Sequence, residues 1–331
     1  MGDRVRDIGE RGLLQRIRRF CPQTVVGDDG ATLPFRDDRS LVVTTDMLVD
    51  GVHFSDRTTS AADAGWRAVA ANLSDLAAMG ATPLGITVGL GVPDDTPVAW
   101  VEQLYTGMRD CLEPYETEIV GGDICRCAVR TLSITAFGSV QPEAEIRRSR
   151  ARVGDAIAIS GPHGLSRAGL ELLLNPEIGQ HLSQSDRTSL IRAHQRPIPR
   201  LDALPLLWKA LGDTTRVAGM DSSDGLADAV LQICRESGVG ATLNGIPVHR
   251  GLTQLVGPET SLDWVLYGGE DFELVLCLPM EAAKAWVAQL GNGAAVVGTI
   301  TDTKKVCVAD TNESQFDLVL TQEGGFQHFR S

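Results

Sequence analysis

The segment AADAGWRAVAANLSDLAAMG, residues 61–80, decides how the first half of the chain is organised. Its apolar side chains recur three and four residues apart, which is the spacing of an amphipathic helix. These side chains are Trp66, Val69, Ala70, Leu73, Leu76 and Ala77. Apolar runs lie on both sides of the segment, at 41–45 and 86–92, and each predicts a buried strand beside the helix.

The rest of the chain predicts a second domain of the same mixed style. In the first half a helix is expected at 97–112, with strands at 118–120 and 131–140. The polar, arginine-rich segment 147–155 then interrupts the pattern. The second half is expected to hold helices near 166–174, 200–211, 224–237 and 281–290, and strands near 156–160, 272–278, 294–300 and 316–320. The fold class is therefore α+β with two domains, 1–150 and 151–331.

Composition narrows the classes of partner. The formal charge of −13 argues against nucleic acid and against a membrane surface, both of which attract basic proteins. No apolar run approaches the roughly 20 residues that span a bilayer, and the charged start of the chain lacks the apolar centre of a signal peptide. Seven scattered cysteines without a Cys-x-x-Cys pair favour reduced, mostly buried thiols. A cytoplasmic protein is expected.

Several common nucleotide-binding and catalytic motifs are missing. The chain has no Gly-x-x-x-x-Gly-Lys-[Ser/Thr] loop, and none of its four lysines lies in a glycine-rich turn. No Gly-x-Gly-x-x-Gly follows a strand, and neither the protein-kinase motifs nor a Gly-x-Ser-x-Gly elbow occurs. Any phosphate chemistry must therefore use other residues.

Aspartates recur where apolar runs end. Asp29, Asp46, Asp123 and Asp221 each follow such a run beside glycine, serine or threonine, and Asp224 comes three residues after the last of them. A single aspartate in this position is more often an Asx-turn or a helix cap than a ligand.

Asp75 is harder to explain in this way. It lies within the predicted apolar helix, where an acid is costly unless it is paired or binds a metal. Together the acids suggest a site for magnesium and phosphate, because Mg²⁺ is held by a few carboxylates along with substrate phosphates. Their spacing alone does not say whether they converge.

A set of short motifs occurs in a fixed order along the chain. The motifs run from Gly27 to Phe329, and together they cover nearly the whole chain. They are Gly27-Asp28-Asp29, Thr44-Thr45-Asp46, Gly51-Val52-His53-Phe54, Asn72 to Gly80, Gly121-Gly122-Asp123, Asp221 to Leu226, Gly268-Gly269-Glu270-Asp271 and Gly325 to Phe329. In this order the motifs resemble those of the thiamine-monophosphate kinase family, within the superfamily that includes aminoimidazole ribonucleotide synthetase and selenophosphate synthetase.

The resemblance implies a role for each matching residue. Positions that hold several magnesium ions around the phosphates match Asp29, Thr44, Thr45, Asp46, Asp75, Asp123, Asp221 and Asp224. Positions that contact ATP match Tyr105, Gly122, Asp123, Arg148 and Ser223. Positions that contact thiamine monophosphate match His53, Glu270 and Phe326. Residues directly involved in transfer match Asp46, Asp123, Arg148 and Asp224.

Some of these roles have ordinary alternatives. Arg148 offers a fork of donors to phosphate, but its neighbours Arg147 and Arg150 could make that contact instead. Tyr105 lies in a helical pattern, where packing is the commoner role of a tyrosine. Phe326 could stack on a flat cationic ring or simply belong to a core.

Three positions depart from the family pattern. Leu165 stands where aspartate is common in a Gly-Asp-Ser turn, so no role is assigned to residues 161–166. Ser222 replaces an aliphatic residue, and Phe272 replaces a tyrosine.

The resemblance implies that ATP phosphorylates thiamine monophosphate to thiamine diphosphate in one in-line step. The acceptor phosphate is already ionised near neutral pH, so a general base is hardly needed. The resemblance also implies a homodimer in which the N-terminal domains pair. The alternatives are a related ATP-dependent enzyme with another acceptor, and a nucleotide-binding regulator without catalysis.

Overall fold

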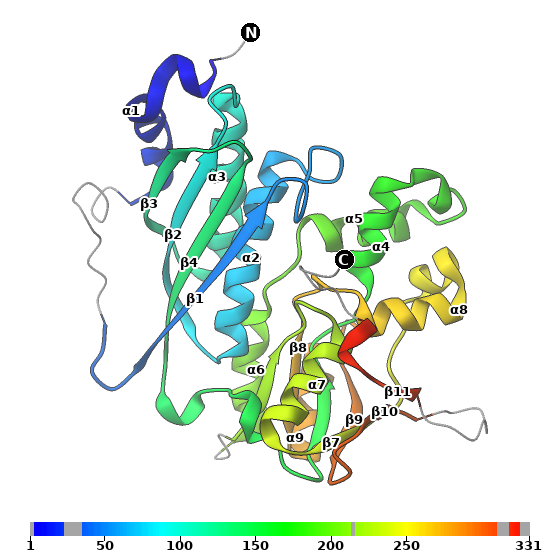
Figure 1. Ribbon diagram of the computed structural model, residues 1–331. Helices are drawn as coiled ribbons and strands as arrows, with labels where there is room; N and C mark the ends of the chain where they lie inside the picture. Colours follow the sequence, from blue (N-terminus) through cyan, green and yellow to red (C-terminus); the bar gives the residue numbers. More distant parts are fainter. Residues whose placement is uncertain (1–2, 23–34, 213–215, 310–317, 325–331) are drawn as a thin grey trace. The chain divides into compact units, whose positions relative to one another are not determined.

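The computed structural model describes residues 3–22, 35–212, 216–309 and 318–324 (Figure 1). The chain forms two compact units. The first contains Met1–Leu76 and Ala81–Gln141, and the second contains Ala77–Gly80 and Pro142–Ser331. The predicted class, two mixed α/β domains, is confirmed. Within the described ranges, no helix is long and apolar enough to cross a bilayer.

The first unit is a four-stranded sheet covered on one face by helices. Its strand order is β1-β4-β2-β3, and only β2 and β3 run parallel. The strands are β1 (Ser40–Val49), β2 (Thr82–Val92), β3 (Ile119–Arg126) and β4 (Thr131–Val140). The helices are α1 (Val5–Ile17), α2 (Ala61–Ala78) and α3 (Val98–Leu112). Figure 1 shows α2 and α3 on one side of this sheet.

The two faces of the first sheet differ in burial. Along β1, Val42, Thr44 and Asp46 are partly buried, whereas Val43 and Thr45 are exposed. Side chains alternate between the faces of a strand, so the first group faces the helices and the second lies on the opposite face, called here the outer face. On β4, Ile134 and Ala136, which pair with Asp46 and Thr44, are fully buried.

The second unit is built on a seven-stranded sheet of order β11-β10-β7-β9-β5-β8-β6. All neighbouring pairs are antiparallel except β10 and β7. The strands are β5 (Ala156–Ile159), β6 (Ala218–Asp221), β7 (Gly240–Leu243), β8 (Leu274–Leu278), β9 (Ala295–Thr301), β10 (Val306–Val308) and β11 (Leu318–Val319). The helices are α4 (Leu165–Leu174), α5 (Gln184–Gln195), α6 (Ala203–Leu211), α7 (Leu226–Ser237), α8 (Arg250–Tyr267) and α9 (Met280–Leu290).

Three loops of the second unit follow or precede buried strands. The strands β5, β6 and β8 are buried at every position. Residues 160–164 lead from β5 into α4, residues 222–225 lead from β6 into α7, and residues 268–273 lead from α8 into β8. Because the strands are fixed by burial, the polar residues of these loops are held at one end of a rigid sheet.

Candidate active site

The first unit brings Thr44, Asp46 and Asp75 to the helix-covered face of its sheet. The Thr44 hydroxyl on β1 donates a hydrogen bond to Asp75 Oδ2 on α2. Asp46 lies two residues further along β1 on the same face, and its backbone N–H donates to Asn72 Oδ1 at 3.2 Å. Asp75, the acid in the apolar helix, is therefore paired. Its carboxylate on α2 and the Thr44 hydroxyl on β1 are two oxygen atoms that could bind a metal side by side.

Thr45, Gly122 and Asp123 occupy other positions on the same sheet. The Thr45 hydroxyl lies 2.8 Å from that of Thr135 across the β1–β4 pair. On β3, Gly122 pairs with Val88 and Asp123 with Gly89, and Asp123 is exposed. The register places Asp123 on the outer face with Thr45, not on the face that holds Asp46 and Asp75.

His53 lies in the turn that follows β1. Its Nδ1 accepts a hydrogen bond from the backbone N–H of Val49 at 3.1 Å. In a neutral imidazole the other nitrogen then carries the proton, so Nε2 of His53 is a donor. The buried Arg67 of α2 donates to the His53 carbonyl at 3.4 Å and so connects the turn to that helix.

Tyr105 is buried in α3, below a pocket of the first unit. Only 2% of the residue is exposed, and burial raises the pKa of its hydroxyl well above the ordinary value. The ring of Phe20 packs against that of Tyr105 at a tilt of 38°, with centroids 5.8 Å apart, and Phe20 lines a pocket of about 800 Å³. The guanidinium carbons of Arg19 and Arg109 lie 4.9 and 5.8 Å from the centre of the Phe20 ring. Sequence reasoning missed Phe20, because a lone aromatic after a helix carries no signal of its own.

In the second unit, Asp221 ends β6 and Asp224 lies in the loop beyond it. Asp221 is 3% exposed, whereas Asp224 is exposed. The Ser222 backbone N–H donates to the Glu273 carbonyl at 2.9 Å, and the Ser223 carbonyl accepts the Glu270 N–H at 2.7 Å. The loop with the predicted metal and ATP residues is thus tied to the loop with the predicted substrate residue.

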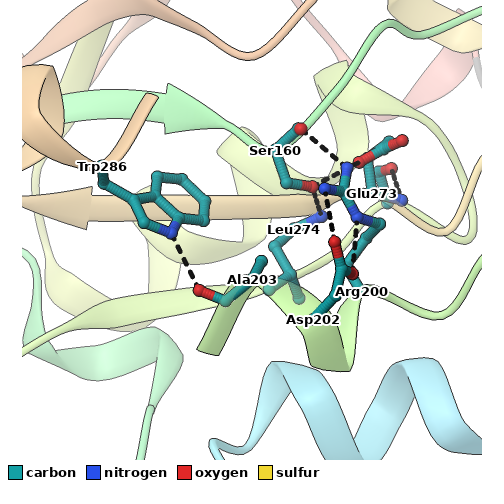
Figure 2. Close-up of polar contacts among 8 residues, drawn as sticks. Ser160, Arg200, Asp202, Ala203, Glu273, Leu274 and Trp286 are labelled. Carbon is teal, nitrogen blue, oxygen red and sulfur yellow. Dashed lines mark hydrogen bonds and ion pairs between the residues drawn. The ribbon is translucent and has the colours of Figure 1, made fainter. Parts of the chain in front are cut away.

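The end of the 268–273 loop next to β8 is anchored by a partly buried ion pair. Arg200 donates to Glu273 Oε2 at 2.6 Å and to the Ser160 carbonyl at 2.7 Å, and the Ser160 hydroxyl also donates to Glu273 (Figure 2). Asp202 binds the other side of the same guanidinium at 3.1 Å. No sequence pattern selects Arg200 or Glu273, because their pairing joins residues far apart in the chain.

Arg148 differs from its two arginine neighbours. Arg147 pairs with the Glu145 carboxylate at 2.7 Å, and Arg150 donates to the Glu145 carbonyl at 2.5 Å. Arg148 instead donates to the neutral amide oxygen of Gln232 on α7 at 2.7 Å. Arg147 and Arg150 thus both bind Glu145, whereas the described partner of the Arg148 guanidinium is a neutral amide.

The donor set is compatible with magnesium. The residues placed here offer hydroxyl and carboxylate oxygens, which are the hard ligands that Mg²⁺ prefers. Within the described part of each unit, no three His, Cys, Asp or Glu side chains are already gathered as a metal cluster. Asp29 and Phe326 lie outside the described residues.

Known proteins resemble this chain over nearly its whole length. Residues 27–140 match the family model for the N-terminal domain of AIR synthase related proteins, and residues 152–310 match that for the C-terminal domain. Thiamine-monophosphate kinase of Synechococcus elongatus is 48% identical, with 99% of each chain covered.

Two solved structures extend the comparison. Thiamine-monophosphate kinase of Stenotrophomonas maltophilia is 33% identical, with a TM-score of 0.79 and with 91% of this chain and 96% of that chain covered. AaThiL complexed with AMPPCP and TMP is 30% identical, with a TM-score of 0.73 and coverage of 96% and 98%.

Proposed function

The chain belongs to the thiamine-monophosphate kinase family, and we propose that it transfers the terminal phosphoryl group of ATP to thiamine monophosphate. The products are ADP and thiamine diphosphate. The observation that carries this proposal is the 48% identity to a thiamine-monophosphate kinase over 99% of both chains. The 30% identical structure with AMPPCP and TMP supports the pair of substrates.

The chemistry asks little of the protein beyond positioning and charge. The acceptor is a phosphate monoester that is ionised at neutral pH, so a direct in-line transfer needs neither a phosphoenzyme nor a strong base. Bound magnesium supplies neutralisation of the phosphate charges. We assign the following ligands to several magnesium ions. In the first unit, Thr44, Asp46 and Asp75 would serve an ion on the helix-covered face, whereas Thr45 and Asp123 lie on the outer face and would serve a different one. Asp221 and Asp224 are assigned in the second unit, and Asp29 is assigned with them. Arg148 is proposed to bind a phosphate oxygen, because its guanidinium is a fixed fork of donors.

The pocket beside Phe20 is proposed to receive the base of ATP. Tyr105 stays a proposed contact of ATP; it is 2% exposed and packs against the ring of Phe20. The pocket volume of about 800 Å³ is in the range of small-ligand sites. Gly122 and Ser223 are proposed as backbone and side-chain contacts to the nucleotide.

Two residues of known position are proposed to bind thiamine monophosphate. His53 presents an Nε2–H donor, which suits a phosphate oxygen. Glu270 presents a carboxylate, which suits the cationic part of thiamine. Phe326 completes this proposal as a ring that stacks on the substrate.

The assembly and its location are also proposals. The outer face of the first sheet carries the exposed apolar residues Leu41, Val43 and Met47, which supports a homodimer through this face. All seven cysteines are free thiols, which supports a reducing compartment such as the cytoplasm.

The decisive experiment measures ADP release by the purified chain with ATP, Mg²⁺ and thiamine monophosphate. We expect turnover with this acceptor and little with other phosphate monoesters. Asp46→Asn should lower kcat by about 100-fold or more, because one magnesium ligand loses its charge. Asp56→Asn is the matched control, since Asp56 is exposed and pairs with Arg130.

Three results would contradict the proposal. Unaltered turnover of Asp46→Asn would remove the metal assignment. Turnover only with a different acceptor would favour a related enzyme. Tight ATP binding without turnover on thiamine monophosphate would favour a regulator.

A further inference from the structure

The loop that carries Glu270 is held in an unfavourable backbone conformation. Glu270 and Phe272 have φ values of 66° and 54°, in the left-handed region that residues other than glycine seldom adopt. Such conformations persist only where surrounding contacts impose them. The residue between them, Asp271, makes contacts of the required kind.

The Asp271 side chain binds the start of helix α4. Its two carboxylate oxygens accept hydrogen bonds from the backbone N–H groups of Gly164 at 2.6 Å and Ser166 at 2.8 Å. These donors belong to the first turn of α4, where backbone N–H groups lack partners within the helix. Gly164 occupies the cap position with φ 81° and has no side chain to accept them. Asp271 therefore caps α4 from a distant part of the chain.

The capping contact is strongly shielded from water. Asp271 is only 8% exposed, so its hydrogen bonds do not compete with solvent. Burial raises the pKa of its carboxyl to about 7, against the opposing effect of the two N–H donors. An acid kept in so unfavourable a place is consistent with a specific positioning role.

The 268–273 loop is also hydrogen-bonded to the 222–225 loop. The Glu270 N–H donates to the Ser223 carbonyl at 2.7 Å, and the Glu273 N–H donates to Ser222 Oγ at 3.2 Å. A Cβ on Gly269 would lie 2.6 Å from the Ser223 carbonyl oxygen, so the two loops touch without a gap. A shift of Asp271 would thus move Glu270 relative to the 222–225 loop.

We propose that Asp271 is a positioning residue that clamps the 268–273 loop to the start of α4 and so fixes Glu270 for thiamine monophosphate. This inference rests on the proposed function. It gives the 161–166 turn a role despite Leu165, because the turn contributes backbone donors rather than an acidic side chain. Asp271 itself does not touch the reacting atoms.

Asp271→Asn tests the clamp, with Asp186→Asn as the matched control. Asp186 also lies in the first turn of a helix, α5, where it accepts the Ser183 hydroxyl at 2.6 Å. The amide introduced by Asp271→Asn can accept only one of the two N–H groups, so we expect KM for thiamine monophosphate to rise about tenfold or more. KM for ATP should stay within about twofold. Asp186→Asn should change neither value, although both variants lose thermal stability.

Amide hydrogen exchange gives a readout that does not depend on the substrate. In Asp271→Asn, exchange should accelerate in peptides covering 163–166 and 268–273, and in Asp186→Asn it should not. Unchanged exchange together with an unchanged KM for thiamine monophosphate would overturn the inference. A native chain that does not turn over thiamine monophosphate would instead refute the proposed function, and the exchange comparison would still decide the clamp. If Asp271→Asn does not fold, Asp271→Glu keeps the charge, displaces the loop by one methylene and carries the same comparison.

Discussion

His163 is a fully buried histidine in the turn between β5 and α4. Among the described residues, neither of its ring nitrogens has a hydrogen-bond partner of good geometry. Burial lowers the pKa of its imidazole from 6.5 to about 4. The side chain is therefore neutral in the folded protein at neutral pH. Burying its two ring nitrogens without a good hydrogen bond lowers the free energy of unfolding.

This burial predicts a pH-dependent loss of stability. The unfolded chain binds a proton at His163 below pH 6.5, whereas the folded chain does so only near pH 4. Protonation of His163 therefore leaves the free energy of unfolding unchanged above pH 6.5 and lowers it as the pH drops toward 4, by up to about 3 kcal/mol. His163→Leu should remove that part of the pH dependence and raise the free energy of unfolding at pH 7 by about 1 kcal/mol.

The measurement is urea unfolding of both proteins at several values between pH 4 and 7. His249→Leu is not a suitable control, because that side chain caps α8. His181→Gln is suitable, since His181 is exposed and bonds only to the Gln254 carbonyl in the described structure. Parallel pH curves for the native chain and His163→Leu would contradict the expectation.

Single residues also mark how far sequence reasoning reaches. An acid in an apolar helix must be paired, so Asp75 could be selected from the sequence, and Thr44 is the partner. Asp271 was only part of a motif, because its function depends on amides more than 100 positions away. The alternation of β1 could have placed Thr44 and Asp46 on one face, but the opposite placement of Asp123 needs the strand register.

At the scale of elements, the crossing of α2 and α3 depends on glycine. A Cβ on Gly107 would lie 1.8 Å from the Ala62 carbonyl oxygen, and one on Gly65 would lie 2.0 Å from the Leu104 carbonyl oxygen. The two helices therefore touch backbone to backbone. Since α2 carries Asp75 and α3 carries Tyr105, this contact sets the spacing of both predicted site residues.

Gly107→Ala should destabilise the first unit despite the higher helix propensity of alanine. Propensity alone would favour alanine by about 1 kcal/mol, but the clash is with backbone and forces the helices apart. We expect a net loss of about 2 kcal/mol and a lower Tm by calorimetry. Gln103→Ala, at an exposed position of α3, should leave Tm nearly unchanged. A Tm of Gly107→Ala equal to or above that of the native chain would show that the helices can separate at no cost.

Elements with strong periodicity were predicted, and those without it were not. Helices α2, α3, α7 and α9 follow clear apolar spacing, and each lies within a few residues of its expected range. The helix α5 is polar over most of its length, and only part of its surface is buried. The helix α8 is interrupted at Gly257-Pro258, a pair that normally ends a helix. Gly257 is not helical, with φ 80°, and helical backbone resumes after it.

For the whole molecule, the division into two α+β units could be anticipated because each half has its own strands and helices. The order of strands could not, since pairing is set by contacts remote in sequence. In the second unit, β5 comes first along the chain yet lies inside the sheet between β8 and β9. The boundary near residue 150 stays a prediction, and the compact units divide at Gln141 and Pro142.

The outer face of the first sheet makes the proposed assembly testable. Val43 and Met47 lie on this face of β1 with 53% and 56% exposed, and Thr45 between them is also exposed. In a homodimer through this face both apolar side chains would leave water, with a gain of about 25 cal/mol for each Å² buried. A carboxylate at either position would have to be buried unpaired or keep the faces apart.

The double variant Val43→Glu/Met47→Glu should therefore be monomeric where the native chain is a dimer. Sedimentation velocity at micromolar concentrations measures the difference directly, and circular dichroism checks that the variant is folded. Ile198→Glu is the matched control, because Ile198 is equally exposed at 56% but belongs to the second unit, so that variant should remain a dimer. A native chain that sediments as a monomer, or a double variant that still pairs, would rule out this face as the interface. Dissociation of both variants would point instead to a contact made by the second unit.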